Sequence, residues 1–144
     1  MFKMVWDAED PNDDPSLDAV QFGVQHAPDA LALANLTRPG PFGLRTVELG
    51  EYFGLFEGTR LIAMAGERMQ AGKFREISGV CTHPDYQGRG YAQKLVLKLI
   101  RRQLRRNEVP FLHVMRANTN AHRLYERMGF KTYREAVVRI VSKQ

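Results

Sequence analysis

Two glycines near the middle of the chain lie where a phosphate group could be bound. Gly88 and Gly90 belong to residues 80–92, in which a predicted strand ends, a short loop follows and a long helix begins. Backbone N–H groups can approach a ligand closely at glycines, and the N-terminus of a helix adds partial positive charge. Arg89 could add a charge-assisted hydrogen bond. The segment therefore predicts a site for a phosphate or diphosphate, although the glycines alone would also suit a tight strand-to-helix turn.

The spacing around these glycines excludes two common phosphate motifs. Gly88-Arg89-Gly90 lacks the third Gly or Ala of the dinucleotide fingerprint, and no Gly-Lys-Ser/Thr follows it as in nucleotide triphosphatases. The loop matches instead the pattern Gln/Arg-x-x-Gly-x-Gly/Ala. A second motif lies one helix and one strand further on, and it reads Asn118-x-x-Ala121-x-x-Leu124-Tyr125-Glu126-Arg127-x-Gly129-Phe130.

With these two motifs, and with His83-Pro84 before the loop, residues 52–140 resemble the GCN5-related N-acetyltransferases (GNAT), and among them the FR47-like group. The superfamily transfers an acetyl group from acetyl-CoA to an amine. The resemblance implies one N-acetyltransferase domain over residues 1–144, in which the amine attacks the thioester directly in a ternary complex. It also implies acetyl-CoA as cofactor, no metal, and an amine-bearing small molecule or peptide as acceptor.

The resemblance assigns cofactor-binding residues to two neighbouring segments. Together with the helix-terminus argument, it gives the diphosphate to the backbone of Gln87, Gly88, Arg89, Gly90, Tyr91 and Ala92. The strand before the loop would pair its backbone with the pantetheine arm through Val80, Cys81 and Thr82, where side-chain identity is loosely specified. Asn118 resembles the family's asparagine that hydrogen-bonds this arm, and capping of the following helix is an equal alternative.

Tyr125 is the candidate catalytic acid. It matches the tyrosine that lies near the thioester sulfur in the family and would protonate the leaving thiolate. The alternative is that Tyr125 only packs its short helix against the core.

Glu76 is the candidate base, at the position where histone-type members of the superfamily carry theirs. Strand alternation places it on one face with Ser78, Val80 and Thr82. A carboxylate in a largely apolar strand is costly unless it is paired or useful, and burial would raise its pKa toward that of a base. Two alternatives stay open: an ordered water as base, and a solvent-exposed Glu76 paired with Arg75, Arg68 or Lys73.

Cys81 and the four histidines are predicted to have no catalytic or metal-binding role. Alternation places Cys81 opposite Glu76, and no His–Asp pair is available to activate its thiol, so we expect a small buried strand residue. The histidines show no metal-binding spacing.

The elements that must position these residues alternate between extended and helical patterns. Extended runs at 52–57 and 60–70 flank a Glu57-Gly58-Thr59 turn, and a third run covers 74–83. A short helix is expected from Asp29, an amphipathic helix at 90–106, a strand at 110–115, a helix at 120–128 and a strand at 131–141. This order predicts an α/β (α+β) fold, with a mixed sheet flanked by helices. The resemblance adds a V-shaped opening between the fourth and fifth strands, here 74–83 and 110–115, and Ser78-Gly79 could tolerate a bulge there.

Composition limits the remaining classes of function. The 144 residues suit one domain, no apolar run approaches the ~20 residues of a membrane span, and a single cysteine favours a reducing, cytoplasmic setting. Residues 1–30 hold seven acids and one base, whereas residues 31–144 hold nine acids and twenty bases. Residues 1–16 are therefore predicted to form an irregular acidic arm.

The excess of basic residues allows a rival function. Seven bases and no acid lie between Gly88 and Arg106, which would suit either a solvated helix face or a nucleic-acid surface. The acidic arm and the lack of an aromatic stacking platform argue against nucleic acid. A domain that binds acetyl-CoA without catalysis is a further alternative. The acceptor, the choice between monomer and homodimer, and the role of residues 1–50 cannot be predicted from these patterns.

Overall fold

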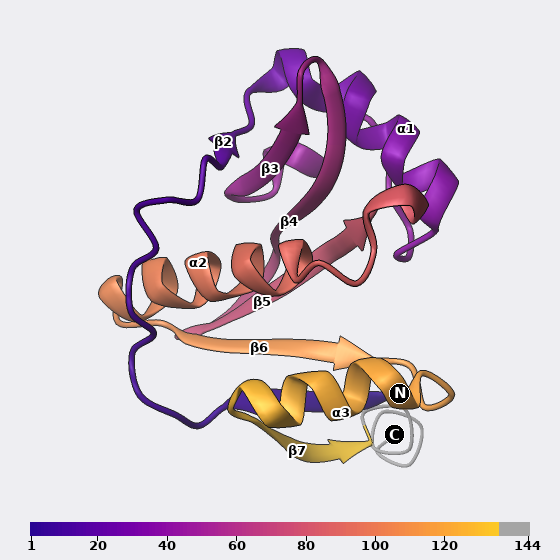
Figure 1. Cartoon of the computed structure of the whole chain (residues 1–144). Coiled ribbons are helices and arrows are strands. Elements are labelled where there is room, and N and C mark those ends of the chain that lie inside the picture. Colours follow the sequence, from indigo (N-terminus) through magenta and orange to yellow (C-terminus); the bar gives the residue numbers. More distant parts are fainter. Residues whose placement is uncertain (136–144) are drawn as a thin grey trace.

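The computed structural model of the chain describes residues 1–135, which form a seven-stranded sheet with helices on both faces (Figure 1). The strands are β1 (Phe2–Trp6), β2 (Val20–Gln21), β3 (Tyr52–Glu57), β4 (Arg60–Ala71), β5 (Phe74–Thr82), β6 (Val109–Val114) and β7 (Phe130–Glu135), in the order β2-β3-β4-β5-β6-β1-β7. The helices are α1 (Ala27–Thr37), α2 (Tyr91–Arg105) and α3 (Thr119–Met128). Every strand pair is antiparallel except β5–β6, so the predicted mixed sheet is confirmed.

Each face of the sheet has its own apolar core. One cluster joins the sheet to the apolar stripe of α2, whose buried residues include Leu95, Leu99 and Ile100. The other cluster joins the sheet to α1 through Ala30 and Leu33. Both helices carry their apolar residues at helical spacing, which explains why the local sequence folds them onto the sheet.

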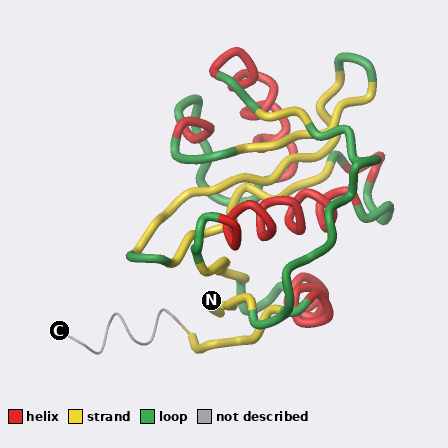
Figure 2. The backbone as a smooth tube through the Cα atoms, turned by 90° about the vertical axis from the view of Figure 1, so that its left-hand side faces the viewer, coloured by secondary structure: helices red, strands yellow, loops and turns green. Residues whose placement is uncertain are grey.

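The prediction of an irregular arm at residues 1–16 is wrong for residues 2–6. These form β1, an interior strand between β6 and β7, with Met4 and Trp6 buried in the core. The alternation of buried side chains at positions 4 and 6 is a strand pattern that the acids further along the chain obscured. After β1, residues 7–19 contain neither helix nor strand and run past α2 to the opposite edge of the sheet (Figure 2).

The C-terminal elements follow the predicted order. The helix predicted at 120–128 is α3, and Gly129 ends it with φ +130°. The strand predicted at 131–141 begins at Phe130 as β7, and the part of that prediction beyond Glu135 lies outside the described residues.

β5 and β6 pair over only a few residues and then separate. The parallel register runs from Phe74↔Val109 to Glu76↔Phe111, after which the two strands diverge toward their C-terminal ends (Figure 1). This is the predicted opening between the runs 74–83 and 110–115. The two strands are fifth and sixth in chain order, because β1 and β2 precede the hairpin.

A bulge in β5 accompanies the opening. From Met64↔Cys81 to Gly66↔Ser78 the register advances two positions on β4 and three on β5, so β5 carries an extra residue. Gly79 lies at this point with φ +65°, a left-handed conformation that favours glycine. A Cβ there would also lie 2.8 Å from the hydroxyl oxygen of Tyr52. The predicted bulge at Ser78-Gly79 is confirmed.

The bulge overturns the predicted assignment of side chains to faces. Ile77 and Val80 both pack with the α2-side core, whereas Cys81 belongs to the α1-side core. An extra residue between positions 77 and 80 reverses the alternation from there on. Val80 therefore lies on the face opposite Glu76, and Cys81 lies on the same face as Glu76, contrary to the sequence-based expectation.

A buried carboxylate ties the C-terminus of α2 to the hairpin and to β5. Glu67 is 1% exposed, accepts hydrogen bonds from Gln103 Nε2 (3.0 Å) and Glu51 N (2.9 Å), and forms ion pairs with Arg106 and with Arg75 at 3.4 Å. We expect Glu67→Ala to lower the free energy of unfolding by about 3 kcal/mol, because its removal leaves buried donors unpaired. Urea unfolding measures the change.

The matched control for this prediction is Glu48→Ala. Glu48 forms an exposed ion pair with Arg45 at 3.2 Å, and such pairs contribute about 0–1 kcal/mol. Similar losses of stability in the two variants would contradict the structural role assigned to Glu67.

Candidate active site at the opening between β5 and β6

The loop between β5 and α2 begins with a single helical turn at Pro84–Tyr86 and ends at Gly90, the N-cap of α2. Gly88 and Gly90 have φ values of +82° and +78°. This left-handed backbone conformation favours glycine at both positions. A Cβ built at either position would meet no atom within 4 Å among the described residues, so the loop surface is open at both glycines.

The start of α2 presents a row of backbone donors. The first bond of this helix runs from Lys94 N to Gly90 O at 3.1 Å. Within residues 1–135, no protein group accepts a hydrogen bond from the N–H groups of residues 88–93. Several unpaired N–H groups at a helix N-terminus form an anion site. The predicted diphosphate segment 87–92 therefore has the donors that such a group requires.

The side chains of the loop hold its shape. The Arg89 guanidinium lies over the ring of Tyr86, 5.1 Å from the centroid, and the Tyr86 hydroxyl hydrogen-bonds Glu57. Gln87 Nε2 donates to Thr82 O at 3.4 Å, and Tyr91 packs against the α2-side core. These contacts leave the backbone N–H groups as the main binding feature of the loop.

The C-terminal half of β5 has a backbone edge without a strand partner. Thr82 and Cys81 pair with β4 on one side, and in the described part of the chain no strand pairs with β5 beyond Glu76 on the β6 side. An extended ligand could add to this edge at Val80, Cys81 and Thr82, as β-augmentation does. The thiol of Cys81 is buried and its pKa is raised to about 11 by desolvation, which agrees with the expected structural role.

Tyr125 packs from α3 against the α2-side core and meets Phe130 edge-on at 5.7 Å between ring centroids. Burial raises the pKa of Tyr125 to about 12, and the phenol is protonated at neutral pH as an ordinary tyrosine is. At the start of the same helix, exposed Asn118 accepts a hydrogen bond from Ala121 N at 3.2 Å. Asn118 therefore acts as a cap, which was one of the two roles expected of it.

Glu76 is buried and paired. It is 1% exposed, accepts hydrogen bonds from Arg68 Nε (2.9 Å) and Nη2 (2.8 Å), and lies 2.9 Å from His113 Nδ1. Burial raises the pKa of Glu76, but the hydrogen bonds from His113 and Arg68 outweigh burial, and the pKa is lowered. The expectation of a raised pKa is therefore wrong. The alternative was a solvent-exposed Glu76 paired with a neighbouring base. Glu76 does pair with Arg68, but it is buried rather than exposed.

Sequence reasoning missed His113 as a site residue. Phe111 and His113 follow the strand alternation on one face of β6, and the parallel pair Glu76↔Phe111 brings His113 beside Glu76. The alternation within β6 can be predicted from its own residues. The register between β5 and β6 cannot be predicted in that way, because it depends on the pairing of residues that are 35 positions apart in the chain.

The structure separates the two predicted catalytic residues across the sheet. Tyr125 packs on the face covered by α2, whereas the alternation places Glu76 on the face opposite Ile77, the α1 side. Glu76 is the last residue of β5 that pairs with β6, so it lies where the two strands begin to diverge.

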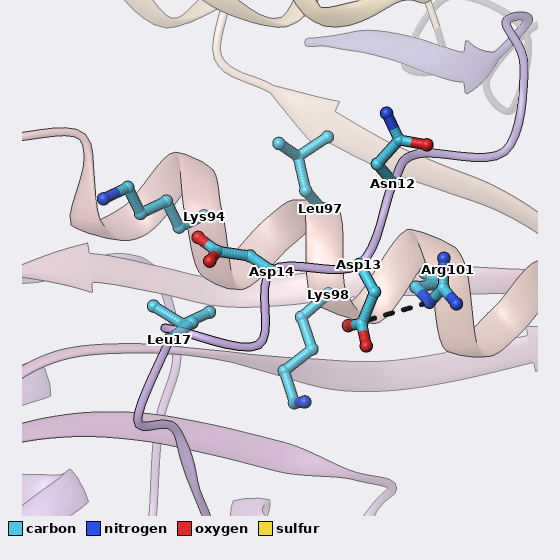
Figure 3. A pocket seen from close by; sticks show the side chains of 8 residues that line it. All are labelled: Asn12, Asp13, Asp14, Leu17, Lys94, Leu97, Lys98 and Arg101. Atoms are coloured by element: carbon cyan, nitrogen blue, oxygen red, sulfur yellow. Dashed lines mark ion pairs between the residues drawn. The ribbon is translucent and has the colours of Figure 1, made fainter.

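The basic face of α2 is partly covered by the acidic segment that follows β1 (Figure 3). Arg101 donates to Pro11 O at 2.9 Å and forms ion pairs with Asp10 and Asp13 at 3.9 and 3.8 Å. Arg102 makes two 2.7 Å hydrogen bonds to Glu51.

A shallow pocket between this segment and the helix is lined by Asn12, Leu17, Lys94 and Lys98, among others. The internal pairing weakens the nucleic-acid alternative.

Residues 1–135 contain neither a metal-binding cluster nor a helix that could span a membrane. No group of three or more His, Cys, Asp or Glu side chains is arranged as metal ligands would be. None of the helices in that part of the chain combines the length and the hydropathy that a membrane span requires.

The comparisons with known proteins agree with this geometry. The model of the FR47-like protein family matches residues 52–140. A Novosphingobium aromaticivorans structure, named as an acetyltransferase of the GNAT family, is 44% identical with a TM-score of 0.86 over 92% of this chain. This chain spans only 59% of the length of that protein. No curated protein matches the sequence.

Two more distant structures share the fold. The ribosomal-protein-S18-alanine N-acetyltransferase of Escherichia coli is 23% identical, with a TM-score of 0.68 over 78% of this chain and 76% of its own. A Mycobacterium tuberculosis protein solved in complex with CoA is 13% identical, with a TM-score of 0.61 over 74% of this chain and 70% of its own.

The chain, with its diverging parallel pair, its β5 bulge and the glycine loop at the start of α2, has the fold of the GNAT superfamily. Within that superfamily the chain belongs to the FR47-like protein family.

Proposed function

We propose that this chain is an N-acetyltransferase that uses acetyl-CoA and transfers the acetyl group directly to an amine. The observation that supports this most strongly is the row of unpaired N–H groups at residues 88–93, next to a strand edge without a partner in the described residues. An anion site at a helix start and an extended backbone edge beside it suit a ligand with a diphosphate and an amide-containing arm. The FR47-like match and the GNAT relatives agree with the proposal.

In this proposal the cofactor, when bound, supplies the acetyl group in activated form as a thioester. The N–H groups from Gly88 to Ala92 would bind its diphosphate, and the backbone of Val80, Cys81 and Thr82 would hold the pantetheine arm in the opening between β5 and β6. Holding both reactants in one orientation lowers the entropic part of the barrier.

Tyr125 would hold the proton that the leaving thiolate requires. Its phenol is protonated at neutral pH, because the ordinary pKa of a tyrosine is 10 and burial raises the pKa of Tyr125 to about 12. Tyr125 also packs edge-on against Phe130. A general acid must carry its proton at the working pH and lie on the side of the leaving group. The tyrosine on the α2 side of the sheet suits that role, with the acceptor amine approaching from the α1 side.

The proposal leaves the acceptor open to small molecules and peptides that carry an amine, and it includes a cytoplasmic setting, which the free, buried Cys81 thiol suits. The test is a screen for acetyl-CoA turnover over a chemically diverse library of amines, including peptides with a free N-terminal amino group. Acetylated product above the uncatalysed rate would support the proposal. Binding of CoA without transfer to any amine would favour the non-catalytic alternative, and absence of both would contradict the proposal.

A further inference from the structure

Three side chains from three adjacent strands meet where β5 and β6 separate. Arg68 of β4 and His113 of β6 both contact the carboxylate of Glu76 in β5. Glu76 pairs in register with Phe111, the last residue of β6 that pairs with β5, and His113 lies two positions further on. The Glu76–His113 contact therefore joins the two strands just past the point at which their backbone pairing ends.

The contact identifies which ring nitrogen of His113 carries a proton. A glutamate carboxyl has an ordinary pKa of 4.5, and two hydrogen bonds from Arg68 keep Glu76 ionised at neutral pH, so its carboxylate can only accept hydrogen bonds. His113 Nδ1, at 2.9 Å from Glu76 Oε2, must be the donor. In a neutral imidazole the lone pair is then on Nε2.

The carboxylate itself is poorly suited to accept a proton from a substrate. Arg68 binds Oε1 and Oε2 of Glu76 together, and His113 takes a further position on Oε2. Glu76 is 1% exposed, whereas the His113 side chain is 21% exposed. Nδ1 of the ring is engaged by Glu76, whereas Nε2 makes no hydrogen bond to any group within residues 1–135.

We propose that His113 is the general base for the acceptor amine and that Glu76, held by Arg68, is its positioning residue. This inference rests on the proposed function and replaces Glu76 as the base. Glu76 fixes the tautomer and the orientation of the ring, as the carboxylate of a catalytic triad does for its histidine.

The proton balance of the reaction is complete with the chain's own groups. The bond between the amine nitrogen and the acetyl carbon forms, and the carbon–sulfur bond breaks. The proton lost by the nitrogen goes to His113 Nε2 on the α1 side, and the phenolic proton of Tyr125 goes to the thiolate sulfur on the other side. Proton exchange with solvent then returns His113 to its neutral form and Tyr125 to its protonated form.

The charged groups around His113 come from each neighbouring strand. Arg68 and Glu76 face it from β4 and β5, and Lys3 of β1 is its antiparallel register partner. The Lys3 ammonium lies over the ring of Phe111, 5.0 Å from the centroid. Arg68 is engaged by Glu76, so the ion pair compensates its charge at the histidine.

The first test compares His113→Gln with His122→Gln in acetyl transfer to an amine found in the screen. His122 is a matched control on α3, 23% exposed and 2.6 Å from Thr132 Oγ1. We expect His113→Gln to lower kcat/KM by at least about 100-fold, with CoA affinity unchanged. The His122 variant should retain its activity within about threefold.

The second test concerns Glu76, whose role is to act through His113. Glu76→Gln should lower kcat by at least about tenfold with little change in KM, and the double variant should be no worse than His113→Gln alone. Glu76→Asp serves as a second variant if the Gln variant does not fold. If the wild type is active, two results would overturn the inference. One is full activity in His113→Gln, and the other is a loss in the double variant equal to the sum of the losses in the two single variants. Failure of the proposed function itself would be recognised by the absence of transfer in the wild type.

Discussion

Gly90→Asp is expected to weaken CoA binding by at least about tenfold, whereas Gly90→Asn should keep an affinity close to that of the wild type. Two unit charges about 5 Å apart interact by about 3 kcal/mol at an effective dielectric constant of about 20, and exposure of the loop reduces this toward the 1.4 kcal/mol of a tenfold change. An aspartate at the N-cap of α2 would place its carboxylate beside the N–H groups proposed to bind the diphosphate.

The Asn variant separates charge from backbone conformation. Gly90 has φ +78°, where Asn and Asp are both tolerated better than other residues. The two side chains are nearly equal in size. Isothermal titration with CoA measures the affinities, and thermal unfolding checks that both variants fold. Equal CoA affinity in the Asp and Asn variants would contradict the assignment of the loop.

Tyr125→Phe is expected to lower kcat by about 100-fold or more and to leave CoA affinity within about twofold. The substitution removes the proton that the leaving thiolate requires, and general acid catalysis contributes about 10²–10⁴-fold. Phenylalanine keeps the packing on the α2-side core and the edge-on contact with Phe130, so the fold should be preserved. Steady-state kinetics with a saturating amine and CoA titration measure the two quantities.

The control for this variant is Tyr133→Phe on β7, where the tyrosine is 63% exposed. We expect that control to retain wild-type kcat. If Tyr125→Phe also keeps full turnover, Tyr125 has only the packing role in α3.

The parts of the fold that could be predicted are those set by local patterns. The apolar stripe of α2 and the turn between β3 and β4 at Gly58 (φ +62°) were readable, because helical periodicity and turn residues are properties of short segments. β1 was missed because its five residues are followed by an acidic segment, and its place between β6 and β7 depends on pairing across the whole chain.

The backbone conformation of the site could be predicted from the sequence, whereas the positions and contacts of its side chains could be predicted only in part. The glycine loop and the bulge at Gly79 follow from residues that permit unusual conformations. The consequence of the bulge, which places Cys81 on the Glu76 face, depends on how β4 and β5 are aligned. The lowered pKa of Glu76 depends likewise on Arg68 and His113, which reach it through tertiary contacts.

The charge asymmetry of the chain also has a structural outcome. The acids after β1 and the bases of α2 were read as an arm and a separate solvated face, but Asp10 and Asp13 lie against Arg101. The segment therefore compensates part of the helix charge within the molecule (Figure 3).

The most direct test of the proposed site is a titration of the ¹⁵N-labelled chain with CoA, followed through its backbone amide resonances. The proposal predicts that the largest shifts occur at residues 88–92, whose N–H groups would bind the diphosphate, and at residues 80–82 on the open edge of β5. Shifts confined to Lys94, Lys98 and the acidic segment beside α2, or no saturable shifts at all, would contradict it.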